Sequence, residues 1–304
     1  MTKTGADGVY GTPPVEIVDV ARGAIQFSPL MPGAARLDEY DGRLDSIVML
    51  APPGTIERRH EMARALLALR AGGAFTVLAP RDKGGSRLVK ELEAFGCAVQ
   101  EAPKRHFRIC WTERPADPVR LADAIADGAP RLVAELGLWS QPGVFSWNRI
   151  DPGSALLTRV LPALSGRGAD LGAGIGYLAH TVLASPAVSE LTLVDIDRRA
   201  IDVARRNVDD SRARFAWADV RKADTLPSGL DFIVMNPPFH DGGAEDRTLG
   251  QAFIRRASES LAKGGTLWLT ANRHLPYEEG LRTLFKHVAL VVDEGGYKVY
   301  EARK

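Results

Sequence analysis

The chain contains little cysteine: only Cys97 and Cys110 occur among its 304 residues. They do not form a Cys-x-x-Cys pair, and so small a number argues against a disulfide framework or a zinc centre. We therefore expect no bound metal, and a reducing cytoplasm is the expected compartment.

Long apolar runs and an excess of one charge are also missing. No run approaches the roughly 20 apolar residues of a membrane-spanning helix, so no membrane association is expected. Residues Met1 to Pro14 are polar and lack a signal-peptide core, which predicts a frayed tail. Lys and Arg number 39 against 38 Asp and Glu, a net charge of +1. A nucleic-acid partner would therefore bind to local basic patches.

What is present includes a glycine run, Asp170-Leu-Gly172-Ala-Gly174-Ile-Gly176, between a short apolar strand and a helical pattern. Glycines here let the backbone approach a cofactor at a helix amino terminus. The dinucleotide fingerprint would place its third glycine at 177, where Tyr177 stands. The actual spacing, with an acid two residues before the first glycine, favours the S-adenosylmethionine (SAM) site of a methyltransferase.

Two further acids stand where such a cofactor needs hydrogen-bond acceptors. Asp195 closes the apolar stretch 191–194, and we expect its carboxylate to accept both ribose hydroxyls. Asp219 follows the next strand pattern and is expected to accept the adenine amino group. The alternative for Asp195 is a helix cap, a role that suits Asp197 better because Asp197 immediately precedes the helical pattern at Arg198.

A second motif, Asn236-Pro237-Pro238-Phe239, follows the apolar run 231–235, which predicts a buried strand. An exocyclic or amide nitrogen is a poor nucleophile because its lone pair is delocalised. The Asn236 side-chain oxygen and the Pro237 carbonyl can accept its two protons and aim the lone pair at a methyl group, while Phe239 stacks on the base. The alternative is a plain turn with Phe239 in the core. The predicted catalytic residues are Asn236, Pro237 and Phe239, and the predicted cofactor ligands are Asp170, Gly172, Gly174, Gly176, Asp195, Asp219 and Asn236.

An internal repeat organises the chain. Residues 45–53 align without gaps on residues 231–239, with identity at Asp, Ile, Val, Met and one Pro. Each segment precedes a helical pattern, a Gly-Gly pair and a strand, which is the αβ step of a doubly wound sheet. The first copy has lost the chemistry, because no glycine run precedes it and three key positions differ. There, Leu50, Ala51 and Pro53 replace Asn236, Pro237 and Phe239.

The predicted fold is therefore α/β, with tandem doubly wound, Rossmann-like methyltransferase domains. Residues 1–140 are expected to form a degenerate copy with a structural or substrate-recognition role, ending in a helix over 119–138. Residues 141–304 are expected to form the catalytic domain. Its sheet is predicted to have seven strands and to end in an antiparallel hairpin built from 287–292 and 297–302.

Several segments of residues 141–304 resemble the RsmC-type ribosomal RNA guanine-N(2) methyltransferases. They are 236–242, 271–277, 296–300, Gly143-Val-Phe-Ser146 and Asp151-Pro-Gly-Ser154. The resemblance implies an inactive amino-terminal domain, an active carboxyl-terminal one, SAM as cofactor, and methylation of a guanine N2 in ribosomal RNA of the small subunit (16S). Ribosomal RNA or a ribosomal subunit is then the partner, and we expect the chain to act as a monomer.

Other functions share part of this pattern. A release-factor glutamine-amide methyltransferase uses the same chemistry, but it usually has Tyr at the position of Phe239 and a helical accessory domain. A non-catalytic RNA-binding assembly factor would not need both motifs intact, and an NAD oxidoreductase conflicts with Tyr177. In the amino half, residues 104–108, Lys-Arg-His-Phe-Arg, are the best basic–aromatic cluster, with an RNA contact and a solvated loop as the alternatives.

Overall fold

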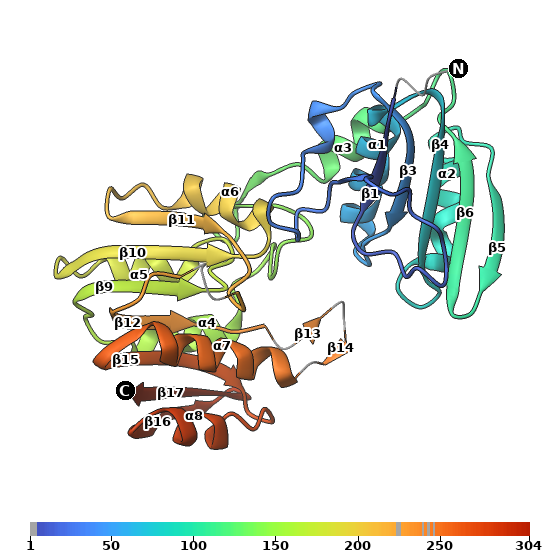
Figure 1. Ribbon diagram of the computed structural model, residues 1–304. Helices are drawn as coiled ribbons and strands as arrows, with labels where there is room; N and C mark the ends of the chain where they lie inside the picture. Colours follow the sequence, from blue (N-terminus) through green and yellow to red (C-terminus); the bar gives the residue numbers. More distant parts are fainter. Residues whose placement is uncertain (1–4, 223–225, 239, 242–243, 246) are drawn as a thin grey trace. The chain divides into compact units, whose positions relative to one another are not determined.

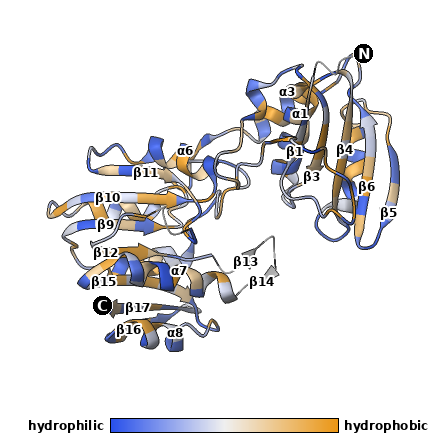
Figure 2. Cartoon of the chain, in the orientation of Figure 1, coloured by the Kyte–Doolittle hydropathy of each residue, from blue (hydrophilic) through white to orange (hydrophobic). Residues whose placement is uncertain are grey.

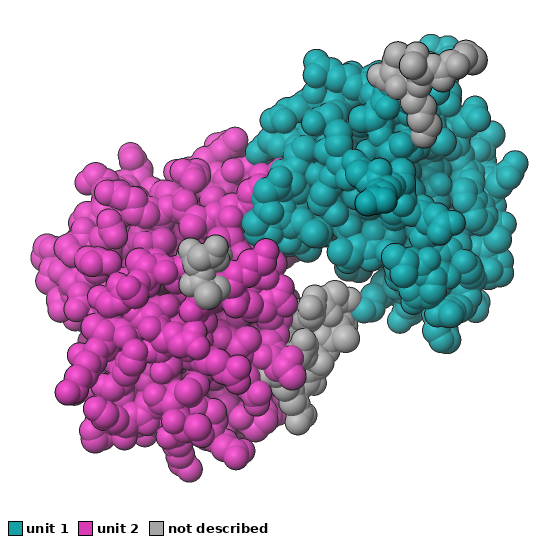
Figure 3. Space-filling model, viewed as in Figure 1, with its two compact units in different colours: residues 1–130, 141–143 teal, residues 131–140, 144–304 magenta. Residues whose placement is uncertain are grey.

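The computed structural model describes residues 5–222, 226–238, 240–241, 244–245 and 247–304. The chain divides into two compact units, residues 1–130 with 141–143 and residues 131–140 with 144–304 (Figure 3). The sequence places one boundary at 140/141, whereas the chain changes unit after Pro130, Ser140 and Gly143. Residues 131–140 group with unit 2 because they form a hairpin whose Trp139 N–H donates to Asn207 Oδ1 at 2.7 Å.

Unit 1 contains a six-stranded sheet in the order β2-β1-β3-β4-β6-β5 (Figure 1). Strands β1, β2, β3 and β4 run parallel, whereas β6 pairs antiparallel with both β4 and β5. Its strands are β1 (Ala6–Tyr10), β2 (Ile25–Gln26), β3 (Leu44–Leu50), β4 (Leu69–Pro80), β5 (Gln100–Lys104) and β6 (Phe107–Glu113). Its helices are α1 (Thr55–Ala68), α2 (Leu88–Glu93) and α3 (Leu121–Asp127), with 3₁₀ turns at Leu37–Glu39 and Gly85–Arg87.

Two sequence predictions in this half are wrong. The expected frayed tail contains β1, which lies between β2 and β3, and its Tyr10 is 4% exposed. The expected helix over 119–138 is only α3, because Gly128-Ala-Pro130 ends it and a hairpin follows. That hairpin consists of β7 (Arg131–Val133) and β8 (Leu138–Ser140), turning at Gly137 with φ 63°.

Unit 2 contains a seven-stranded sheet in the order β11-β10-β9-β12-β15-β17-β16 (Figure 1). The first five strands are parallel, and β17 pairs antiparallel with both β15 and β16, which confirms the predicted terminal hairpin. The strands are β9 (Gly166–Leu171), β10 (Val188–Asp195), β11 (Ala213–Trp217), β12 (Leu230–Met235), β15 (Leu261–Asn272), β16 (His287–Glu294) and β17 (Tyr297–Arg303), with a short pair β13 (His240–Asp241) and β14 (Ala244–Glu245). The helices are α4 (Pro152–Val160), α5 (Tyr177–Leu183), α6 (Arg198–Asn207), α7 (Arg247–Ser260) and α8 (Glu278–Leu284).

The central strands of both sheets are apolar because helices or loops cover both of their faces (Figure 2). Side chains cap α4 and α6, whereas α5 follows Gly176, which has no side chain to cap it. The Asp197 carboxylate accepts from Arg199 N at 2.9 Å, which confirms Asp197 as the cap of α6. Asp151 accepts from Ser154 N at 2.8 Å and, with Pro152 at the first helical position, starts α4, a helix that the sequence predictions did not include.

The repeat seen in the sequence is also present in the sheets. Strands β1, β3, β4, β6 and β5 are ordered as β9, β12, β15, β17 and β16. Val9 pairs with Val48, and Asp170 pairs with Val234, the repeat partner of Val48. Val9 therefore stands where unit 2 has Asp170. Two residues further on, both units have a glycine with nearly the same positive φ, Gly11 with 76° and Gly172 with 75°.

Candidate active site

The glycine loop lies between β9 and α5. Gly172, Gly174 and Gly176 all have a positive φ, of 75°, 54° and 84°, which favours glycine. A Cβ added to Gly174 would meet no atom within 4 Å, so this glycine borders open space. One added to Gly176 would lie 2.9 Å from Val208 Cγ2. Gly172 and Gly174 thus line the pocket, whereas Gly176 turns the chain into α5 and allows close packing.

Asp195, at the carboxyl end of β10, supports this loop. Its Oδ2 accepts from Gly174 N and its Oδ1 from Asp197 N, each at 2.8 Å. Burial raises the pKa of Asp195 to about 6, opposed in part by these backbone N–H groups. A carboxylate has about four acceptor positions, so two hydroxyl donors could still be accepted.

Asp195 predicts a pH dependence of cofactor binding. Ribose hydroxyls would donate to the ionised carboxylate, and protonation removes that acceptor. Below about pH 6, SAM affinity is therefore expected to fall as the pH drops through the Asp195 pKa, by up to about tenfold per pH unit. Calorimetric titrations across this range measure it. An affinity independent of pH would exclude Asp195 as an ionised acceptor.

Asp170, the last residue but one of β9, is fully buried. Among the described residues neither of its carboxylate oxygens has a hydrogen-bond partner. Burial, with the neighbouring charge of Asp195, raises its pKa to about 8. An unpartnered buried carboxylate is costly unless a positive group comes near it. SAM carries a sulfonium and an ammonium group, so this acid and the open glycine loop fit that cofactor.

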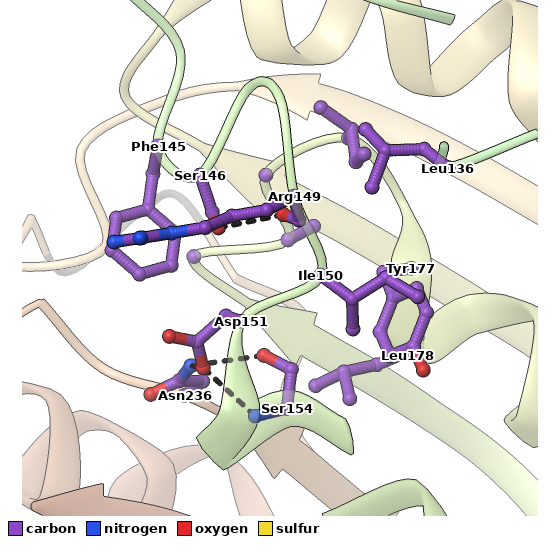
Figure 4. Close-up of a pocket in the computed structure, with 14 residues that line it drawn as sticks. Leu136, Phe145, Ser146, Arg149, Ile150, Asp151, Ser154, Tyr177, Leu178 and Asn236 are labelled. Atoms are coloured by element: carbon purple, nitrogen blue, oxygen red, sulfur yellow. Dashed lines mark hydrogen bonds between the residues drawn. The ribbon is translucent and has the colours of Figure 1, made fainter. Parts of the chain in front are cut away.

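Asn236 follows β12, and its amide orientation is fixed by two neighbours. Asn236 Nδ2 donates to Asp151 Oδ1 at 2.8 Å and to Ser154 Oγ at 2.9 Å (Figure 4). An ionised carboxylate only accepts hydrogen bonds, so the nitrogen must face Asp151. The Asn236 side-chain oxygen then points away from this pair (Figure 4). It is available as an acceptor at the carboxyl end of the sheet.

The glycine loop and Asn236 meet in one pocket. A Cβ added to Gly172 would lie 3.9 Å from the Asn236 carbonyl oxygen and 3.8 Å from Pro238 Cδ. The pocket is lined by Leu136, Phe145, Ser146, Arg149, Ile150, Asp151, Ser154, Gly172, Ala173, Gly174, Ile175, Tyr177, Leu178 and Asn236 (Figure 4). Among the described residues, no group of three or more His, Cys, Asp or Glu side chains is placed to hold a metal ion.

The remaining predicted residues lie in different surroundings. Pro237 is buried in the turn and does not line the pocket. Phe239 lies outside the described residues. Asp219 forms a bidentate ion pair with Arg221, at 2.8 Å on each oxygen, which lowers its pKa. Oδ1 also accepts from Arg221 N at 3.0 Å, and the contact of Asp219 with adenine stays a prediction.

Several pocket residues were missed as site residues. Asp151 and Ser154 hold the Asn236 amide, and Phe145 and Arg149 stand at the pocket mouth, where Phe145 is 60% exposed. The available signal was the helix-start pattern Asp151-Pro-Gly-Ser154, in which an acid precedes proline. This pattern predicts a helix cap at Asp151, but no neighbouring residue in the sequence indicates a contact with Asn236.

Replacing Asp151 by alanine should lower the rate of methyl transfer more than cofactor affinity. The change removes the acceptor that orients the Asn236 amide, so the amide can rotate. It also removes the cap of α4, which costs about 1 kcal/mol of stability. Unfolding midpoints and SAM titrations would be measured beside kcat. A variant with normal kcat would show that Asp151 only caps the helix.

A parallel sheet with an antiparallel terminal hairpin, a glycine loop with two acids, and an Asn-Pro-Pro turn define a SAM-dependent methyltransferase. The methyltransferase small domain family matches residues 135–301, more than half of the chain. The chain belongs to the ribosomal RNA small subunit methyltransferase C family. It is 33% identical over 293 residues to that protein from Pseudomonas paraeruginosa, covering 92% of this chain and 86% of the relative.

Two further relatives span nearly the same length. The ribosomal RNA small subunit methyltransferase C of Shewanella sediminis is 29% identical, covering 91% of this chain and 80% of the relative. A solved structure, the T. thermophilus 16S rRNA N2 G1207 methyltransferase (RsmC) in complex with AdoMet and guanosine, is 26% identical with a TM-score of 0.78. That match covers 100% of this chain and 89% of the other, so both units are included.

Within the described residues, no helix combines the length and apolar composition that crossing a membrane requires. Cys97 and Cys110 are both buried and free, and burial raises the pKa of each thiol. Neither cysteine lines the pocket.

Proposed function

We propose that this chain transfers a methyl group from SAM to the exocyclic N2 of a guanine in 16S ribosomal RNA. The observation that carries the proposal is the fixed amide of Asn236, whose oxygen is left as an acceptor beside the glycine loop. The related T. thermophilus protein, named as an N2 G1207 methyltransferase of 16S rRNA, supports the choice of nitrogen and RNA. We propose the equivalent guanine as the target.

The chemistry follows from the acceptors at the end of β12. Asn236 Oδ1, with the Pro237 carbonyl, would accept hydrogen bonds from the guanine amino group and orient its lone pair. When bound, SAM supplies the methyl group: N2 gains it and releases one proton, and the sulfonium becomes a neutral thioether. Asp195 and the glycine loop would hold the cofactor. A base in folded RNA must leave its stack to reach the pocket.

The proposal is tested by product analysis. The purified chain would be incubated with labelled SAM and either a 16S rRNA transcript or small ribosomal subunits, and nucleosides would be separated by mass spectrometry. N2-methylguanosine at one position is expected. Label in no nucleoside of either substrate would contradict it, as would label in the glutamine of a release factor supplied in a parallel reaction. Mapping modified guanines in cells lacking the gene identifies the position.

The sequence predicts a degenerate copy over residues 1–140, and we also propose that unit 1, residues 1–130 with 141–143, is this copy and serves recognition or folding. Val9 replaces the acid that Asp170 provides in unit 2. The side chain of Gln26, from β2, fills the turn after β1, where its Oε1 accepts from Gly11 N at 3.1 Å and from Ser28 N at 2.9 Å. Arg58 fills the region after β3, donating to the Pro53 carbonyl at 2.8 Å and pairing with Glu91. Side chains of unit 1 itself thus form hydrogen bonds with backbone groups in both turns.

The full-length chain is therefore expected to bind one SAM molecule. The acceptors and donors that a second cofactor would need in unit 1 already have intramolecular partners. Calorimetry of the full chain measures the stoichiometry, with a Gln26→Ala variant as the control that opens the turn. Two equivalents of SAM per chain would overturn the assignment of unit 1.

The cell compartment and assembly state belong to the same proposal. All predicted site residues lie in unit 2 of one chain, which supports action as a monomer. The predicted chemistry needs no metal. A substrate in ribosomal RNA supports the cytoplasm as the place of action.

A further inference from the structure

Helix α6 and its neighbours carry arginines stacked on aromatic rings. The guanidinium carbons lie 5.0 Å from the ring centroid for Arg198 over Trp217, 5.0 Å for Arg205 over Phe215, and 4.8 Å for Arg206 over Trp139. Phe215 and Trp217 belong to β11, the edge strand beside α6 (Figure 1). We call these six residues the arginine–aromatic surface.

The positive charge of this surface is concentrated in the last turn of α6. Within the part of the chain that the structure describes, Arg205 and Arg206 form no ion pair with a carboxylate, and both are exposed. The other arginines nearby are paired, Arg212 with Asp210 at 2.7 Å and Arg214 with a glutamate at 3.7 Å. Arg205 and Arg206 thus keep donors for a ligand while the rings restrict their side chains.

The basic–aromatic cluster of residues 104–108 differs in this respect. Arg105 lies 3.6 Å from Glu16 and Arg108 lies 3.4 Å from Glu101. The Lys104 ammonium donates to the Ile17 carbonyl at 2.8 Å. Intramolecular partners therefore already use these charges, which makes the cluster a weaker candidate than α6.

The arginine–aromatic surface is also connected to the pocket. Trp139 exchanges two backbone hydrogen bonds with the Asn207 side chain, at 2.7 and 2.9 Å. The same Asn207 amide donates to the Ile175 carbonyl at 2.8 Å. Ile175 lines the pocket, as does Leu136 of the β7–β8 hairpin. Hydrogen bonds through Asn207 therefore connect Trp139 of this surface to a residue that lines the pocket.

We propose that the arginine–aromatic surface binds the phosphate backbone of the RNA strand that continues from the nucleotide in the pocket. The inference rests on the proposed function and adds where the substrate chain runs. Arginine suits this role because its planar guanidinium donates two parallel hydrogen bonds to a phosphate and stacks on rings. A nearly neutral protein needs such a local patch to hold RNA.

The test reverses the two unpaired charges in the full chain. Arg205→Glu with Arg206→Glu should weaken binding of a 16S rRNA transcript by about tenfold or more at moderate salt. The slope of log affinity against log salt should fall by about one to two, one for each phosphate that the variant no longer neutralises. SAM affinity should not change. The matched control is Arg255→Glu with Arg282→Glu, two exposed arginines on α7 and α8 with the same change in charge.

Further variants separate a ligand role from a structural one. Basic residues at a helix carboxyl end also stabilise the helix, so unfolding midpoints are compared. Arg205→Lys with Arg206→Lys keeps the charge and should retain most of the salt slope. RNA affinity and salt slope equal to those of the control would overturn the proposal. So would unchanged RNA affinity with weakened binding to small ribosomal subunits, because the surface would then dock a ribosomal protein.

The result is distinguishable from failure of the proposed function. Suppose that the chain methylates no guanine, yet RNA affinity and its salt slope fall in the reversed-charge variant. The RNA-binding role of the surface is then supported and the proposed reaction is contradicted. If guanine N2 is methylated and the variant binds RNA like the control, the proposed reaction is supported and the RNA-binding role of the surface is contradicted.

Discussion

Replacing Asn236 by alanine will lower kcat for methyl transfer by about 100-fold or more while leaving SAM affinity unchanged. The Asn236 oxygen is oriented by Asp151 and Ser154, and it would accept from the amino group of the substrate, whose nitrogen changes geometry in the transition state. An acceptor that matters most there affects kcat and has little effect on ground-state binding. No charge is removed, so the glycine loop should keep its structure.

Single-turnover rates and cofactor titrations measure this effect separately. Asn148→Ala is the matched control, because Asn148 is in the same unit and does not line the pocket. A decrease in kcat of less than about tenfold, equivalent to about 1.4 kcal/mol, would exclude the acceptor role of Asn236.

Replacing Asp195 by alanine will weaken SAM binding by roughly 1.5–3 kcal/mol, which is about 10- to 150-fold in Kd. Two effects act together: the ribose hydroxyls lose a charged acceptor, and Gly174 N–H loses its partner at 2.8 Å. Asp195→Asn keeps one acceptor oxygen of similar position and should lie between the wild type and Asp195→Ala.

Calorimetric titration of the empty protein provides the measurement. Asp209→Ala serves as the control, because this carboxylate is exposed on the same unit beyond α6. An Asp195→Ala variant with wild-type affinity would remove Asp195 from the cofactor site, leaving it only as a support for the loop.

Local spacing was enough to predict the elements that carry the two motifs. The strand before Asn236 and the turn after Asp170 are both encoded within a few residues. The repeat indicated two tandem α/β units, whereas the order of strands in each sheet is known only from the structure. The strand β1 was missed because its continuous apolar stretch is only Val9-Tyr10, after Asp7-Gly8, although pairing on both sides buries Tyr10. The helix expected over 119–138 is only Leu121–Asp127, because Gly128 and Pro130 end it.

The parts of the site that could not be predicted are those formed by tertiary contacts. Asn236 is 85 residues from Asp151 and 82 from Ser154 along the chain, and folding of the sheet brings their side chains together. The exposed ring of Phe145 is at the pocket mouth for the same reason. Sequence reasoning indicated the reactive groups but not the groups that orient them.

The buried carboxyl of Asp170 makes the stability of the catalytic unit depend on its ligand. The native protein keeps a proton on this group up to about pH 8, whereas an unfolded chain releases it near 3.8. The native state thus binds the extra proton between these values, and the free energy of unfolding of the empty protein falls as the pH rises through that window. A bound cationic ligand offsets this loss, and its contribution grows with its concentration. Cells short of methyl donor would then hold a catalytic unit that opens more often to proteases, so the supply of cofactor would help to set the lifetime of the protein.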